Sequence, residues 1–116
     1  MNDFDIPIFK KIYELYKTFH GLRALINKQD RYTVWQKSEE TILEILEHIL
    51  SASQAAKADK PPLLQKASVK LNLLRVFIRL MKDARTLDNK KYTALESLVD
   101  EIGRMLGGWI KSVKEL

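Results

Sequence analysis

Residues 71–81 read LNLLRVFIRLM, and eight of these eleven residues are apolar. Apolar positions in this stretch and its flanks recur every three or four residues, which is helical spacing rather than strand alternation. They form two stripes, whereas a helix of a monomeric bundle needs only one. The first stripe contains Ala67, Leu71, Leu74, Ile78 and Met81, and the second contains Val69, Leu73, Val76, Leu80, Ala84 and Leu87.

The second stripe has two interpretations. Neighbouring helices of the same chain could cover this helix on most sides, although a bundle of four helices has no central member. Alternatively, a large exposed apolar patch marks an interface with another molecule. We favour the second interpretation, and expect a homo-oligomer in which Leu73, Val76 and Leu80 contact another copy of the chain.

The same helical spacing runs through three other segments. The predicted helices cover residues 7–26, 33–58, 62–85 and 90–113, and they are separated by the breaks INKQDRYT (26–33), ADKPP (58–62) and TLDNKK (86–91). Short connections make consecutive helices antiparallel. The sequence therefore predicts a single all-α domain over residues 1–116, an antiparallel up-down-up-down four-helix bundle.

Composition excludes several classes of protein. The chain is 46% hydrophobic and 30% charged, which is typical of an ordered globular domain. It has no cysteine, so disulfides, thiolate zinc sites and cysteine catalysis are excluded. No apolar run approaches the roughly 20 residues of a membrane span, and the first residues lack the apolar core of a signal peptide. We expect a cytoplasmic protein that does not contact membranes.

Positive charge is concentrated in one part of the chain. The formal net charge is +5, yet residues 60–91 contain nine Lys or Arg and only two Asp, whereas the remainder is slightly acidic. Arg75, Arg79 and Lys82 follow one line of the predicted third helix, and Arg85 extends it with a small offset. Cations at this spacing can neutralise several nucleic-acid phosphates. The alternative is a solvated edge that keeps the helix soluble.

Three glycines interrupt the last predicted helix, in LVDEIGRMLGGWIK (98–111). Gly103 and Gly107 are four residues apart and share a face beside the apolar stripe that includes Trp109. Each helical glycine costs about 1 kcal/mol relative to alanine, so the missing side chains suggest a close approach by another group. Packing within one subunit and packing between subunits both fit this pattern. The spacing matches no phosphate-binding glycine motif.

No catalytic motif is present. Glu44, Glu47 and His48 would be the only start of a carboxylate metal site, but such a site needs a second Glu-x-x-His pair and further glutamates on other helices. A solvated acidic helix face is the simpler interpretation. No serine lies in a nucleophile-elbow motif. We therefore predict a protein without catalytic residues, metal or cofactor, and a metal enzyme built on the second helix is the weakest alternative.

Two long segments resemble a known family. The segment LLRVFIRLMKDARTLDNKKYTALESLVDEIGRMLGGWIK (73–111) closely resembles the accessory variability determinant (Avd) family of diversity-generating retroelements. The segment DRYTVWQKSEETILEILEHIL (30–50) is similar to a helix of the wider group of four-helix-bundle proteins encoded in ribosomal-RNA intervening sequences. The resemblance covers almost the whole chain, and LVDEIGRMLGGWIK is its most specific element.

This resemblance implies a non-catalytic protein that assembles as a barrel-shaped homopentamer. It also implies partners, namely the reverse transcriptase of the element and its template RNA (or DNA), which bind a basic surface during mutagenic cDNA synthesis. Arg75, Arg79, Lys82 and Arg85 stand where that surface would lie, and Arg104 in the glycine motif is a further candidate. The alternative is an oligomeric bundle of the intervening-sequence type with a structural or unknown role.

Overall fold

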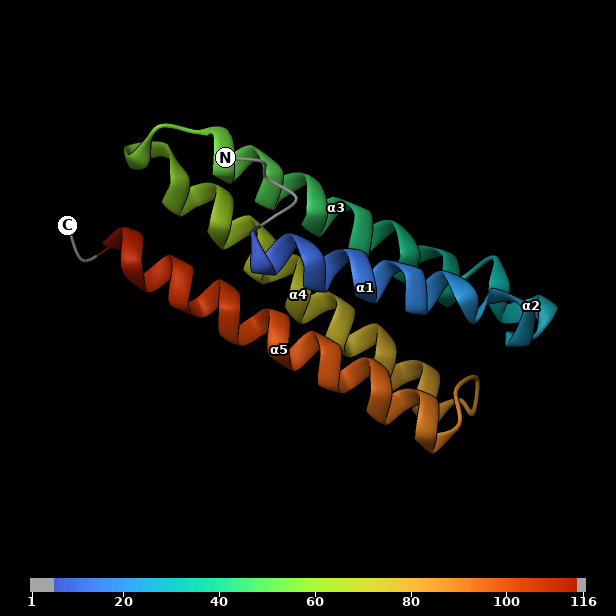
Figure 1. Ribbon diagram of the computed structural model, residues 1–116. Coiled ribbons are helices and arrows are strands. Elements are labelled where there is room, and N and C mark those ends of the chain that lie inside the picture. Colours follow the sequence, from blue (N-terminus) through green and yellow to red (C-terminus); the bar gives the residue numbers. More distant parts are fainter. Residues whose placement is uncertain (1–5, 115–116) are drawn as a thin grey trace.

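Four long helices pack side by side along their lengths (Figure 1). The computed structural model describes residues 6–114. Its long helices are α1 (Pro7–Gly21), α3 (Val34–Gln54), α4 (Lys60–Asp83) and α5 (Asn89–Lys114). The short ones are η2 (Arg23–Leu25), α2 (Lys28–Arg31) and η3 (Lys57–Asp59). Each long helix packs on the next and α5 returns to α1, in an elongated body of 46 × 24 × 22 Å.

This arrangement is all-α and agrees with the predicted bundle. Each long helix buries one apolar face in a shared core, and the first stripe of α4 lies wholly within it. The residues of that stripe are Ala67, Leu71, Leu74, Ile78 and Met81, each no more than 3% exposed. None of the described helices is long and apolar enough to cross a membrane.

The first predicted helix ends earlier than expected, because α1 stops at Gly21 rather than at residue 26. The chain continues through η2 to Ile26, whose extended backbone (φ −84°, ψ 133°) accompanies a buried side chain. Asn27 then starts α2, because its side-chain oxygen accepts the backbone N–H of Asp30 at 2.9 Å. A capped turn of helix therefore replaces the last turn that periodicity predicts for α1.

The bounds of the second and third helices differ from the predicted ones on both sides of the break between them. α3 ends at Gln54 rather than at residue 58, since Ala55 is extended, and α4 begins at Lys60 rather than at residue 62. The Lys60 ammonium donates to the carbonyl oxygens of Ala52 at 2.7 Å and Ser53 at 3.3 Å. These carbonyls belong to the last turn of α3, where a cation is favourable.

The end of α4 shows that the prediction of Leu87 in the second stripe is wrong. α4 stops at Asp83, before the predicted residue 85, and Arg85 adopts a left-handed conformation with φ 63°. The N–H of Thr86 bonds to the carbonyl of Met81 and the N–H of Arg85 to that of Lys82, which is a Schellman motif. The chain reverses here, so Leu87 turns into the core at 2% exposure instead of extending the second stripe.

Candidate nucleic-acid interface

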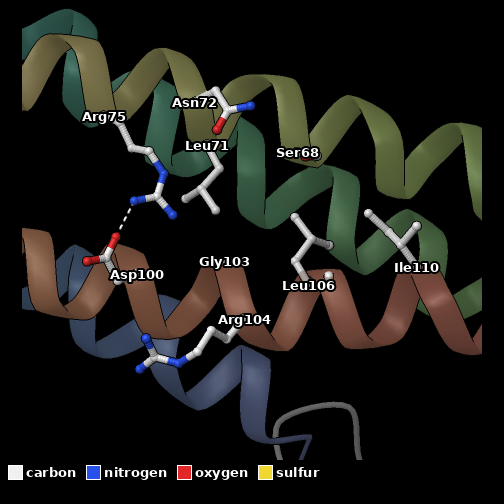
Figure 2. Close-up of a pocket in the computed structure, with 10 residues that line it drawn as sticks. Ser68, Leu71, Asn72, Arg75, Asp100, Gly103, Arg104, Leu106 and Ile110 are labelled. Atoms are coloured by element: carbon white, nitrogen blue, oxygen red, sulfur yellow. Dashed lines mark hydrogen bonds and ion pairs between the residues drawn. The ribbon is translucent and has the colours of Figure 1, made fainter.

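Arg75 is a partly buried member of the predicted basic residues. Its guanidinium reaches from α4 to α5 and forms an ion pair with Asp100, and the two side chains are 37% and 44% exposed (Figure 2). Gly103 provides the space, because a Cβ at this position would lie 2.6 Å from an Nη atom of Arg75. One predicted glycine thus accommodates a side chain of the same subunit.

Gly107 differs from Gly103. Apart from its chain neighbours and the backbone of its own helical turns, no atom of the described residues lies within 4 Å of the position that its Cβ would take, and the same is true of Gly108. Packing within the subunit therefore does not explain the absence of a side chain at Gly107. Both Gly103 and Gly107 line a shallow groove of about 350 Å³ between α4 and α5.

The groove brings together residues that the sequence placed on separate helices. Arg75 and Asp100 lie along it with Arg104, whose side chain extends on the other side of the α5 ribbon from Arg75 in Figure 2. Arg104 is exposed and forms no ion pair or hydrogen bond with any described residue. Its guanidinium is free to bind an anionic partner. The remaining lining residues are Ser68, Leu71, Asn72, Leu106 and Ile110.

Arg79 and Lys82 have neighbours of their own. The Arg79 Nε atom lies 3.3 Å from both carboxylate oxygens of Asp83, and this carboxylate raises the pKa of the guanidinium. The Lys82 ammonium lies 4.5 Å from the ring centroid of Tyr92, within the range of a cation–π contact. The Tyr92 hydroxyl donates to Glu96, and this hydrogen bond raises the pKa of the tyrosine.

The predicted basic line is therefore less positive than its sequence indicates. Asp100 and Asp83 offset two of its four cations, and Lys82 lies over an aromatic ring. Asp83 was visible four residues after Arg79, at the spacing of a helical ion pair. The sequence does not predict Asp100 as a partner of Arg75, because Asp100 lies on α5 and only the packing of α4 against α5 brings the two together.

The Arg85 side chain has no ion-pair partner among the described residues, and its backbone adopts an unfavourable left-handed conformation. Its side chain is exposed and has no partner among the described residues. A non-glycine residue in the left-handed region costs about 1 kcal/mol, and glycine is the usual residue at this position of a Schellman motif. Arg85 thus stands where the backbone alone would favour glycine.

The predicted oligomer residues lie in different surroundings. Val76 is 55% and Leu80 52% exposed, and Leu73, one turn before Val76, is partly buried. Val69, at 58%, extends this face towards the start of α4. We call Val69, Leu73, Val76 and Leu80 the outer face of α4. Trp109 lies elsewhere, partly buried in an apolar groove of about 620 Å³ that Ile6, Pro7, Ile8, Ser53, Lys60 and Met105 also line.

Glu44 on the acidic face of α3 has a basic partner on α4. Glu44 lies 2.6 Å from the Lys70 ammonium, which lowers the pKa of the carboxyl. His48 lines a different apolar groove beside Lys70. Within residues 6–114, no three His, Asp or Glu side chains are grouped as metal ligands would be.

Comparison with known proteins places the chain in a family. A family model described as bAvd-like matches residues 7–113, which is nearly the whole of the four-helix arrangement. No curated protein matches the sequence. The match includes α4 and α5, the two helices that carry the basic residues and the glycines. The chain belongs to the bAvd-like family, the bacterial Avd proteins of diversity-generating retroelements.

Proposed function

We propose that this protein is the accessory subunit that joins the reverse transcriptase of a diversity-generating retroelement to its template RNA. The observation that carries the proposal is the family match over residues 7–113, because members of this family are non-catalytic accessory proteins of such elements. A chain of this kind contributes binding surfaces rather than reacting groups. Its contribution to mutagenic cDNA synthesis is to hold polymerase and template together.

Phosphate binding is supported by the state of the basic residues. Arg85 and Arg104 are exposed and unpartnered among residues 6–114, so neither has to give up a partner to bind a phosphate. Arg75 pairs with a carboxylate at a partly exposed site and Arg79 at an exposed one, and a guanidinium binds phosphate with the same two-pronged geometry. These two arginines can therefore exchange an internal carboxylate for an external phosphate.

Assembly is supported by the outer face of α4. Three of its aliphatic side chains are more than half exposed and lie on one side of one helix, which leaves apolar surface in contact with water. A second copy of the chain would cover this surface, and a barrel-shaped homopentamer is the assembly that the family implies. Five copies would repeat the cationic residues around a ring and strengthen RNA binding through avidity.

Charge reversal at two arginines tests the RNA contact. Arg75→Glu with Arg79→Glu is expected to remain folded and oligomeric while losing most of its affinity for structured RNA. Arg75→Gln with Arg79→Gln, which adds no repulsion towards Asp100, is expected to lose less. Lys57→Glu with Lys66→Glu is the matched control, because both lysines are exposed and unpartnered among the described residues.

The readouts are fluorescence anisotropy with a labelled structured RNA, and co-purification of the reverse transcriptase. Wild-type protein that binds neither partner would contradict the proposed function. Equal loss of RNA affinity in the arginine variant and the lysine control would contradict the role of Arg75 and Arg79 alone.

A further inference from the structure

One end of the bundle combines positive charge with an exposed aromatic side chain. This end consists of the connection between α1 and α3 (residues 22–33) and the start of α5 with the turn before it (residues 84–91). The two segments contain six Lys or Arg and two Asp, so they supply four of the five net positive charges of the chain. The charge of the α1–α3 connection adds to that of the basic segment 60–91 only in the folded molecule.

A hydrogen bond joins the two segments. The Thr86 hydroxyl donates to a carboxylate oxygen of Asp30 at 2.8 Å, across 56 positions of sequence. The Asn27 side chain donates to the same oxygen at 2.7 Å. The bond between Thr86 and Asp30 holds α2 against the turn that contains Arg85. We call the surface formed by residues 22–33 and 84–91 the basic end.

The acidic residues of the basic end are engaged internally, whereas three of its cations are not. Asp30 is occupied by Asn27 and Thr86, and Asp88 lies 2.5 Å from the Lys91 ammonium and accepts the backbone N–H of Lys91 at 2.8 Å. By contrast, the side chains of Lys28, Arg85 and Lys90 are exposed and have no partner among residues 6–114.

Tyr32 adds a flat apolar surface. It is 60% exposed, and the Arg23 guanidinium carbon lies 5.9 Å from the centroid of its ring. An exposed aromatic ring beside cations is the arrangement on which bases of single strands stack while phosphates are neutralised. The ring beside Arg79, that of Tyr92, is less suited to stacking, because it is partly buried and already contacts Lys82 and Glu96.

We propose that the basic end binds single-stranded RNA, with Lys28, Arg85 and Lys90 on phosphates and one base stacked on Tyr32. This inference rests on the proposed function and places the single-strand contact at the basic end rather than along α4. The conformation of Arg85 agrees with this role, because the position favours glycine for the backbone and an exposed cation occupies it nonetheless.

The first test removes the three free cations. Lys28→Ala, Arg85→Gly and Lys90→Ala are combined, and Arg85→Gly suits the left-handed backbone, so folding is preserved. Lys57→Ala, Lys66→Ala and Lys114→Ala form the control, since these exposed lysines lie outside the basic end and have no partner among the described residues. Anisotropy with a short labelled single-stranded RNA is measured over a range of salt concentrations.

The variant of the basic end is expected to bind about ten-fold more weakly, and the slope of log Kd against log salt is expected to fall by about 2, since each lost single-strand phosphate contact removes about 0.7. The control is expected to keep the wild-type slope. Equal slopes in the two variants would overturn the inference while leaving RNA binding intact. Wild-type protein without RNA affinity would instead contradict the proposed function.

The second test separates stacking from charge. Tyr32→Ala is expected to weaken binding of single-stranded RNA about ten-fold and to leave binding of a duplex of the same sequence unchanged, because paired bases cannot stack on the ring. Tyr32→Phe keeps the ring and is expected to bind as wild type. Equal loss for single strand and duplex would overturn the stacking role. Unchanged RNA affinity with lost reverse-transcriptase binding would identify the basic end as a protein-docking surface and overturn the inference.

Discussion

The two faces of α4 are similar in composition but differ in their surroundings. Leu74 and Ile78 on the inner face are at most 2% exposed, whereas Val76 and Leu80 on the outer face are more than half exposed. Both faces show the same helical spacing of aliphatic residues. The inner face is explained by the fold of one chain, whereas the outer face stays exposed in that fold and is the surface that we propose for assembly. Hydrophobic periodicity thus predicts which faces of a helix are apolar, but it does not identify what covers each face.

The largest expected effect comes from the inner face. Leu74→Ala is expected to lower the free energy of unfolding by about 3 kcal/mol, because it leaves a cavity where the side chain is fully buried. Val76→Ala, in the outer face, is expected to change the stability of a separated protomer by less than about 0.5 kcal/mol. Urea unfolding monitored by circular dichroism measures both. Equal costs would remove the distinction between the two faces.

The outer face is tested by its effect on assembly. Val76→Asp with Leu80→Asp is expected to separate the oligomer into protomers that keep their helical circular-dichroism spectrum, because buried carboxylates without partners are costly in an interface. Ala94→Asp with Ser97→Asp adds the same charge at exposed positions of α5 and serves as the control. A variant of the outer face with the mass of the wild type would show that this face is not the assembly surface.

The two glycines of the groove give a smaller contrast of the same kind. Gly107→Ala is expected to raise the stability of a separated protomer by about 1 kcal/mol, since helix propensity improves and no neighbour lies within 4 Å. Gly103→Ala is expected to be close to neutral, because the same gain is offset when the new Cβ displaces the Arg75 guanidinium from Asp100. Thermal unfolding of each variant measures this difference.

Assembly separates the two roles further. Gly107→Leu is expected to disturb the oligomer although nothing in the subunit contacts this position, and a normal oligomer with normal stability would refute a role of Gly107 between subunits. Gly103→Ala is expected to leave assembly unchanged, since its contact lies within the subunit.

The smallest expected effect concerns the ion pair at the edge of the outer face. Lys70 lowers the pKa of Glu44, so the pair stabilises the fold above the unfolded pKa of about 4.5 and loses this contribution as the pH falls through the lower folded value. Glu44→Gln is expected to cost about 0.5 kcal/mol at neutral pH and nothing at pH values below both pKa values, because the pair is partly exposed. A cost that is independent of pH would contradict this assignment.

The sequence alone predicted the four long helices and the core residues of α4, because helical periodicity and proline or polar breaks are local signals. It misplaced Leu87 and the end of α4, because an arginine at a left-handed position gives no turn signal of the kind that glycine gives. It also missed the Arg75–Asp100 pair and the link between Asp30 and Thr86. Both depend on which helices become neighbours, and local spacing does not contain that information.

The basic residues show the same limit. Helical spacing predicts their position along α4. Of the two carboxylates that pair with them, Asp83 lies on α4 itself, whereas Asp100, the partner of Arg75, lies on α5. The positive charge of the connection between α1 and α3 gives no signal in the sequence, because it becomes significant only beside the turn at Arg85. A basic surface is therefore identified from the folded arrangement of charges rather than from their density along the chain.

Solution mass by light scattering, at several salt concentrations with and without a structured RNA, tests assembly and RNA binding together. We expect a salt-resistant mass near five times the 13.5 kDa of the chain, which rises when RNA is added and returns to the protein value at high salt. A monomer whose mass is indifferent to RNA would contradict both the assembly role of the outer face of α4 and the RNA-binding role of the basic residues.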